Sequence, residues 1–405
     1  MPLRTQGLHY GWAIVAALAV TETISWGIIY YSFPVFLQAM ERDLGATRVA
    51  ITGALSVGLG VSALAAVPVG WWLDRFGPRA LMTAGSCLAA VLLIAWSRVE
   101  SLGVLYLVWG AMGLAMAATL YEPAFAAVVQ WFASHRDRAL LTVTLAAGLA
   151  STIFMPVAAW LLGRQGWRAA TVTLAVTLAL TTIPIHALVL RRPRAGRAPD
   201  RGPAGPATGG HSLHAAMRTV VFWILAGVFA VGTFTTTSIS VHLLPYLTQH
   251  GYSAQFAAVA VGWMGAMQLL GRIFYLPVAS RLGPVGVTAS VCLTQGAAMV
   301  LLAIAVQLGG LAPAIILLGA ANGMATLARA TTVAETFGPR HYGSIGGAIA
   351  VAANGARALG PVGASLLFAW LGGYERVFWA FAGALGLSGF AVLAAEPRSR
   401  RGDRA

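Results

Sequence analysis

The chain has 405 residues, of which 58% are hydrophobic and only 9% are charged, and its mean hydropathy is +0.77. A soluble domain carries about 25% charged residues, so this composition excludes a soluble protein and indicates one that crosses a membrane many times. The formal charge is +14, and all 26 basic residues are arginine. Because most of them lie in loops, we expect them to face the anionic surface of a lipid bilayer. A nucleic-acid partner is not expected.

Twelve apolar segments follow one another along the chain, each long enough to cross about 30 Å of hydrocarbon. They span residues 10–38, 49–72, 79–97, 101–132, 139–163, 168–190, 217–247, 253–280, 285–308, 310–337, 342–371 and 374–395. A helix satisfies its own backbone hydrogen bonds in lipid, so every segment is expected to be helical. The sequence therefore predicts an all-α membrane protein with twelve transmembrane helices.

A short polar loop, Gly70-Trp-Trp-Leu-Asp74-Arg75-Phe-Gly77-Pro78-Arg79, separates the second segment from the third. Its charges and its Gly-Pro turn cannot lie in hydrocarbon, which predicts a tight turn at a membrane surface. Gly77 and Pro78 are expected to end one helix and start the next. Asp74 is expected either to cap the following helix or to pair with an arginine across the loop.

The same turn recurs in degraded form as Ser280-Arg281-Leu282-Gly283-Pro284, with Arg281, Gly283 and Pro284 at a constant offset of 206 from their counterparts. Residues 191–214 are rich in Pro, Gly and Arg and have no apolar periodicity, which is typical of a flexible linker. We therefore predict two pseudo-symmetric six-helix bundles, residues 1–190 and 215–405, joined by a cytoplasmic linker at 191–214.

The arginines are unevenly divided between the two sides of this topology. Seventeen lie in the termini, the linker and the loops on the side of Gly70–Arg79, six lie in the opposite loops, and three lie inside spans. Arginine-rich loops stay in the cytoplasm, so both termini are expected there, with the chain in the inner (plasma) membrane. Cys87 and Cys292 both fall inside apolar spans and no metal-ligand spacing occurs, so no disulfide, metal or cofactor is expected.

The twelve spans, the repeated half, the basic linker and the pattern G-x-x-x-D-R-x-G-x-R between spans 2 and 3 together resemble the major facilitator superfamily over nearly the whole chain. The resemblance implies a monomeric transporter with a cytoplasmic gating latch that stabilises the outward-open state. The latch residues would be Gly70, Asp74, Arg75, Gly77 and Arg79. The second copy of the turn has Ser280 in place of Asp74, so a second complete latch is not expected.

Two further stretches, His9-Tyr10-Gly11-Trp12 and Trp131-Phe132…Arg136-Asp-Arg138-Ala139, resemble the monocarboxylate and oxalate–formate branch of that superfamily. The branch places a substrate-binding arginine in helix 8, where this chain has Arg272. The oxalate transporter of this branch has a lysine in helix 11, and the corresponding position in this chain is near Asn354. The nearest cation in this chain is Arg357, about one turn away.

Ionisable side chains inside the spans are few, and each costs at least about 2.5–3.5 kcal/mol at mid-bilayer, so each is expected to face a cavity. Gln268, Arg272 and Tyr275 recur at i, i+4 and i+7 and form one polar stripe of a helix. Arg272, Arg357, Asn354, Gln268 and the aromatic Trp26 and Tyr30 are the predicted substrate-binding residues. For Arg272 a structural ion pair is the alternative.

Two carboxylates lie well inside the spans and away from their ends, Glu22 and Glu122. Glu22 shares a helix face with Trp26 and Tyr30, and both acids are candidates for proton coupling, with packing or capping as the alternative role. Arg329 lies near the repeat position of Glu122, which favours a gate or ion pair over a ligand.

Three arginines against two carboxylates favour an anionic substrate, because the planar guanidinium holds a carboxylate with two hydrogen bonds. We therefore predict a secondary transporter that moves a small organic anion, in particular a monocarboxylate, with a proton or an exchanged anion. The alternatives are proton-driven efflux of a hydrophobic or cationic drug-like compound, and a sensor that does not transport. No nucleophile–base pair or phosphate-binding loop is apparent in the spans, so an enzyme is not expected.

Overall fold

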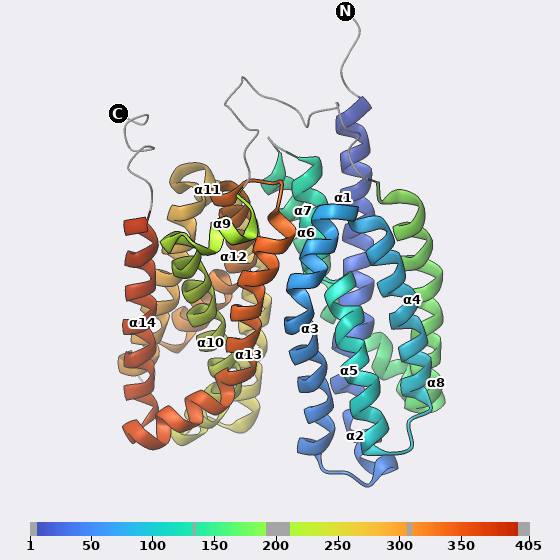
Figure 1. The fold of residues 1–405 in the computed structure, drawn as a ribbon. Coiled ribbons are helices and arrows are strands. Elements are labelled where there is room, and N and C mark those ends of the chain that lie inside the picture. The colour runs from blue at the N-terminus through green and yellow to red at the C-terminus, as the bar shows by residue number, and fades with distance from the viewer. Residues whose placement is uncertain (1–5, 133–134, 192–210, 306–309, 396–405) are drawn as a thin grey trace, which may run out of the picture. The chain divides into compact units, whose positions relative to one another are not determined.

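The computed structural model describes residues 6–132, 135–191, 211–305 and 310–395, and all regular structure in these ranges is helical (Figure 1). Nine helical segments within them are long and apolar enough to cross a membrane. Two of the longest, Arg136–Val189 and Val259–Ile304, are each interrupted at a glycine with non-helical φ and ψ, Gly166 and Gly283 respectively. The predicted linker lies mostly outside the described residues.

The chain divides into two compact units, each described here by itself. The first comprises Met1–His211 together with Phe337–Val351, and the second comprises Ser212–Thr336 together with Ala352–Ala405. The helices up to residue 211 are α1 Gln6–Ser25, η1 Trp26–Tyr31, α2 Ser32–Leu44, α3 Arg48–Phe76, α4 Pro78–Ser97, α5 Leu102–Thr119, α6 Tyr121–Trp131, α7 Arg136–Gly148 and α8 Ala150–Val189. Those that follow are α9 Leu213–Met217, α10 Val220–Gln249, α11 Ala254–Ala305, α12 Leu311–Phe337, α13 Tyr342–Leu371 and α14 Tyr374–Ala395.

The turns of the two halves repeat in their backbone conformation. Glycines with positive φ occur in three pairs that are 206 residues apart: Gly45 and Gly251, Gly77 and Gly283, Gly166 and Gly372. Positive φ is a conformation that glycine adopts without a steric penalty. Gly166 and Gly283 interrupt α8 and α11 where the sequence predicts boundaries between spans. The repeat of the polar turn at Gly77 and Gly283 is thus accompanied by two further pairs of matching turns.

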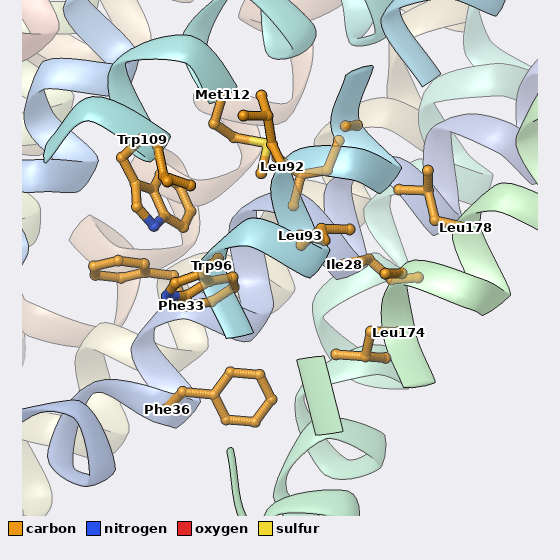
Figure 2. Packing of buried hydrophobic residues seen from close by; sticks show 14 of the residues in the cluster. Ile28, Phe33, Phe36, Leu92, Leu93, Trp96, Trp109, Met112, Leu174 and Leu178 are labelled. Carbon is orange, nitrogen blue, oxygen red and sulfur yellow. The ribbon is translucent and has the colours of Figure 1, made fainter. Parts of the chain in front are cut away.

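A dense apolar core fills the first unit (Figure 2). Phe33, Trp96 and Trp109 meet at its centre, with ring centroids 4.5 Å apart for Phe33 and Trp109 and 5.2 Å apart for Trp96 and Trp109. Ile28 belongs to the same cluster and is fully buried. Residues of α4, α5 and α8 therefore pack against η1 and α2.

Matching helix pairs in the two units approach each other backbone to backbone. A Cβ atom on Gly113 of α5 would overlap the carbonyl oxygen of Gly58 on α3. At the position 206 residues later, a Cβ atom on Gly319 of α12 would press against the carbonyl oxygen of Met264 on α11. Small residues permit this close packing of membrane helices. The offset of 206 therefore relates not only the turns but also the positions inside the helices.

Candidate functional site

The first predicted span, residues 10–38, changes from α-helix to π-helix a few residues after Glu22. The α-helix α1 ends at Ser25, and the next six residues, Trp26–Tyr31, form the π-helix η1 before α2 begins at Ser32. π-Helical turns inside longer helices are rare and occur frequently at functional sites. The aromatic sequence of this turn, with Trp26, Tyr30 and Tyr31, thereby lies next to a buried carboxyl group.

The fourth predicted span, residues 101–132, is also interrupted. Leu120 has an extended conformation (φ −89°, ψ −159°) and separates α5 from α6, which begins at Tyr121. Pro123 follows as the third residue of α6, where its missing N–H would have no intrahelical partner in any case. Glu122 lies in this first turn, where the helix dipole favours a negative charge. Interrupted helices inside a membrane span are typical of transporter binding sites.

The two irregular segments meet through aromatic side chains. The Trp26 ring lies 5.0 Å from that of Tyr121 and 5.5 Å from that of Tyr30, and Tyr30 lies 5.2 Å from Tyr31 (centroid distances). Each pair is tilted or edge-on, as aromatic pairs prefer. The structure thus brings together the predicted residues Trp26 and Tyr30 and adds Tyr31 and Tyr121 to them.

The carboxyl group of Glu22 interacts with one ring of this aromatic cluster. Its residue is 0% exposed, and it interacts with the indole of Trp26 and electrostatically with Glu122. Neither carboxyl oxygen has a hydrogen-bond partner of good geometry in the described part of the chain. An ionised carboxylate removed from water without donors is costly, so a proton on this group relieves that cost.

The predicted polar stripe Gln268, Arg272 and Tyr275 lies on α11 in the second unit and is largely buried. Arg272 on α11 is only 6% exposed, and Gln268 is half-buried one turn before it. Tyr275 is fully buried, and its hydroxyl shares a hydrogen bond of 2.6 Å with the hydroxyl of Thr331 on α12. Tyr275 therefore ties α11 to α12 and fixes the helix face that carries Arg272.

The other predicted residues of the second unit differ in burial. Arg357 on α13 is exposed, whereas Asn354 one turn before it and Arg329 on α12 are half-buried. Of the arginines predicted to bind substrate, Arg272 is therefore the one removed from solvent.

Asp74 caps a helix that is remote in the sequence. Its Oδ1 accepts a hydrogen bond from the backbone N–H of Gly343 and its Oδ2 accepts one from that of Ser344, both at 2.9 Å. These groups belong to the first turn of α13, whose free N–H groups favour a carboxylate. The expectation that Asp74 caps the following helix is wrong, because α4 begins at Gly77 and Pro78 without a side-chain cap.

Glycines hold α3 against the start of α13 around this cap. A Cβ atom on Gly70 would overlap the carbonyl oxygen of Gly343, and one on Gly347 would overlap that of Ala66. Any side chain at Gly70 or Gly347 would therefore move the amides away from the carboxylate of Asp74. Gly70, predicted as a latch residue, has a steric role.

The remaining latch residues are placed around this contact. Gly77 closes α3 with positive φ (81°), and its N–H donates to the carbonyl of Leu73. The guanidinium of exposed Arg75 lies 5.5 Å from the ring of Trp71 and 5.3 Å from that of Phe76, a cation–π arrangement. Arg79 is exposed in the first turn of α4.

We expect Asp74→Asn to slow transport about tenfold. Asparagine keeps one acceptor oxygen but loses the charge and the second acceptor, a loss of about 1–2 kcal/mol at the start of α13. The measurement is the initial rate of substrate uptake together with the dissociation constant, which should change much less. Ser280→Ala is the matched control, because Ser280 occupies the repeat position and its hydroxyl bonds the carbonyl of Pro277 in its own helix. Equal damage from both changes contradicts the assignment.

The two stretches that resemble one branch of the superfamily contact each other. The Tyr10 ring lies 5.4 Å from that of Trp131, and the Trp12 ring lies 5.3 Å from that of Phe132. The indole of Trp131 donates to the carbonyl of Arg191, and the hydroxyl of Tyr10 donates to that of Val189. These motifs thus form one aromatic cluster that ties the start of α1 to the ends of α6 and α8.

The sequence analysis did not predict the interruption between α5 and α6 or the π-helical turn η1. Pro123 inside a predicted span was the available signal for the interruption, because proline has no N–H and its ring clashes with the carbonyl group four residues earlier, here that of Thr119, where α5 ends. The π-turn has no comparable marker in its sequence, Trp-Gly-Ile-Ile-Tyr-Tyr.

Comparisons with known proteins agree with this architecture. The human organic anion transporter MFSD10 (TETRAN) has a solved structure that matches with a TM-score of 0.72 at 17% identity, covering 95% of this chain and 99% of that one. The structure of FucP in its outward conformation matches with a TM-score of 0.73 at 14% identity, covering 96% of this chain and 100% of that one. At these identities the likeness concerns the fold alone.

A search of curated proteins finds no match for the chain. The sequence profile of the Major Facilitator Superfamily, in contrast, matches residues 15–361, which is most of the chain and includes both irregular segments and Arg272. The resemblance to that superfamily is confirmed, and with it the expectation of a membrane transporter rather than an enzyme. The chain belongs to the Major Facilitator Superfamily.

Proposed function

We propose that this secondary transporter carries a small organic anion, specifically a monocarboxylate, by alternating access and together with a proton. The observation that supports this most is Arg272, a cation that is 6% exposed within a membrane-spanning segment. Charged residues inside membrane spans mark substrate and ion pathways, and a guanidinium binds a carboxylate through two parallel hydrogen bonds. Arg357, Asn354 and Gln268 are assigned to the same anion site.

Proton coupling is assigned to Glu22, with Glu122 as the second carboxyl group. Glu22 is fully buried without a hydrogen-bond donor of good geometry in the described residues. Glu122 interacts with it electrostatically. A change in the protonation of Glu22 on substrate binding would couple the two processes, which symport requires.

Gating is assigned to the latch around Asp74, with Gly70, Arg75, Gly77 and Arg79. The two hydrogen bonds of Asp74 to α13 favour the conformation in which they form. We take this to be the outward-open state, with the latch on the cytoplasmic side. Arg329 is proposed as a further gating residue on α12.

The topology proposed for the membrane follows the arginines. Trp131 contacts Arg191, and Gln130 donates to the carbonyl of Leu73 at 3.5 Å, so the ends of α3, α6 and α8 lie at one end of the first unit. This is the end that carries Arg75, Arg79 and Arg191, and we assign it to the cytoplasm. The protein then lies in the inner membrane with both termini inside, and it is expected to act as a monomer.

A second candidate function rests on the aromatic cluster of the first unit. The rings of Trp26, Tyr30, Tyr31 and Tyr121 lie close together, and Trp26 interacts with the carboxyl group of Glu22; aromatic rings beside a carboxylate suit a hydrophobic cation through cation–π attraction. In that case the protein would exchange protons for a drug-like cation and export it.

Uptake into proteoliposomes distinguishes the two functions. The probes are labelled lactate, propionate and acetate as anions and labelled tetraphenylphosphonium as the cation, each measured with and without an imposed pH gradient. For the anion function, carboxylate uptake exceeds that of protein-free vesicles and accelerates when the outside is made acidic. Transport of the cation alone, driven by an opposite proton gradient, contradicts the anion function and supports efflux.

A further inference from the structure

A buried polar cluster in the second unit is not used by the anion site. Thr236 on α10, Gln295 on the later half of α11 and Asn322 on α12 meet there. The Thr236 hydroxyl donates to Asn322 Oδ1 at 2.7 Å, and Gln295 Nε2 donates to the same oxygen at 2.8 Å. Three helices are thus joined through one amide oxygen.

The cluster leaves two hydrogen-bonding atoms unmatched. Gln295, only 2% exposed, has no partner for its Oε1 in the described residues, and Asn322 has none for its Nδ2. Amide oxygen and nitrogen are easily interchanged in a structure, but reversing both amides changes nothing essential. Asn322 would then donate to Thr236 and Gln295, and one acceptor and one donor would again be left over. The cluster therefore offers one donor and one acceptor in either assignment.

The repeat shows that the fold does not need polar groups here. The positions 206 residues earlier are Ala89 on α4 and Met116 on α5, both buried in the apolar core of the first unit. The same helix pairing is therefore built from an alanine and a methionine in one half and from two amides in the other. A buried amide with unmatched atoms is costly, so a role beyond packing accounts for the pair.

A glycine on α10 lies beside the unmatched oxygen. A Cβ atom on Gly232 of α10 would lie 3.3 Å from Gln295 Oε1, so glycine keeps side-chain atoms away from this position. Thr236 and Asn322 are half-buried, whereas Gln295 lies behind them. Gln295 is thus the most deeply buried of the three side chains.

We propose that Gln295, Asn322 and Thr236 form a neutral subsite that binds a hydroxyl group of the transported molecule, so that the substrate class is a hydroxylated monocarboxylate. A hydroxyl donates one hydrogen bond and accepts others, which matches the unmatched oxygen of one amide and the unmatched nitrogen of the other. Both atoms are sealed from solvent in this conformation, so the hydroxyl reaches them in another conformation of the transport cycle. The hydroxyl thereby favours that conformation. The inference rests on the proposed anion function for the carboxylate, whereas the hydroxyl subsite stands on its own contacts.

The test compares two pairs of compounds that differ only in a hydroxyl group: lactate with propionate, and the neutral methyl lactate with methyl propionate. Binding to the purified protein is measured from the ligand concentration dependence of its thermal unfolding midpoint. The parent is expected to bind each hydroxylated member roughly 10- to 100-fold more tightly than its partner. A parent without this preference in either pair overturns the subsite.

The decisive comparison uses variants that introduce, at Gln295 and Asn322, the residue types found at the repeat positions of the first unit. Asn322→Met and Gln295→Ala are expected to reduce the hydroxyl preference to within about twofold. Thr236→Val, a smaller change, should lower it in part, and Thr236→Ser should keep it. Thr237→Val is the matched control on α10, because the Thr237 hydroxyl bonds the carbonyl of Thr233 in its own helix. A preference that survives in both Asn322→Met and Thr236→Val overturns the assignment.

The two pairs also separate the subsite from the anion function. If the hydroxyl preference appears in the esters and is lost in the variants while carboxylates bind no better than esters, the subsite is supported and the anion function fails. If carboxylates bind better than esters without any hydroxyl preference, the anion function is supported and the subsite fails.

Discussion

Replacing Arg272 by alanine is expected to reduce organic anion binding by more than about a hundredfold. The substitution removes a buried charge and a bidentate hydrogen-bond donor at once, and charge-assisted hydrogen bonds contribute about 1.5–3 kcal/mol each. Arg272→Lys keeps the charge but loses the planar fork, so binding should weaken by about 1–3 kcal/mol. The measurement is the dissociation constant for lactate in purified protein, alongside the initial rate of its uptake.

Two other arginines serve as comparisons. Arg281→Ala, at the exposed end of the same span, should leave anion binding unchanged, because its side chain lies in solvent. Arg357→Ala should weaken binding less than Arg272→Ala, since Arg357 is exposed whereas Arg272 is buried. If Arg272→Ala binds and carries organic anions like the parent, the anion site is wrong and efflux of a cation becomes the better account.

Replacing Glu22 by glutamine is expected to abolish accumulation driven by a pH gradient while exchange of substrate across the membrane continues. The carboxamide has the shape of the protonated acid and cannot release a proton. Glutamine has nearly the same shape and volume as glutamic acid, so it should disturb the packing little even at this fully buried position. The assay compares uptake of labelled lactate into empty vesicles under a proton gradient with its exchange against unlabelled lactate inside the vesicles.

Glu100→Gln is the control, because Glu100 is exposed in the turn between α4 and α5 and should affect neither assay. Gradient-driven uptake that persists in Glu22→Gln would transfer the proton to another group. Glu122→Gln is the variant to measure next, since Glu122 is the carboxylate that interacts with Glu22.

The helices were predictable from the sequence to within a few residues because lipid imposes one requirement on every span. An apolar run of sufficient length forms a helix there, and the predicted segments 342–371 and 374–395 coincide with α13 and α14. The turn at Gly77 was predictable for a similar reason, since Gly-Pro ends one helix and begins the next.

The site was predictable only where one helix carries it. Glu22, Trp26 and Tyr30 share a face by spacing alone, and the structure places them together. Tyr121 could not be added from the sequence, because its contact with Trp26 depends on how α6 restarts after Leu120. The hydrogen bonds of Asp74 to α13 cross 269 and 270 residues of sequence, and no local rule predicts a partner at that distance.

The division of the chain into units has a consequence for the order in which the protein is made. The first unit includes Phe337–Val351, so it is incomplete when residue 211 has left the ribosome. At about 5–20 residues per second, its missing segment follows on the order of 10 s later. During that interval the glycine surface of α3 at Gly70 lacks its partner helix, and Asp74 lacks the two amides it will accept from. The contact between α3 and α13 can therefore form only after most of the second half has been synthesised.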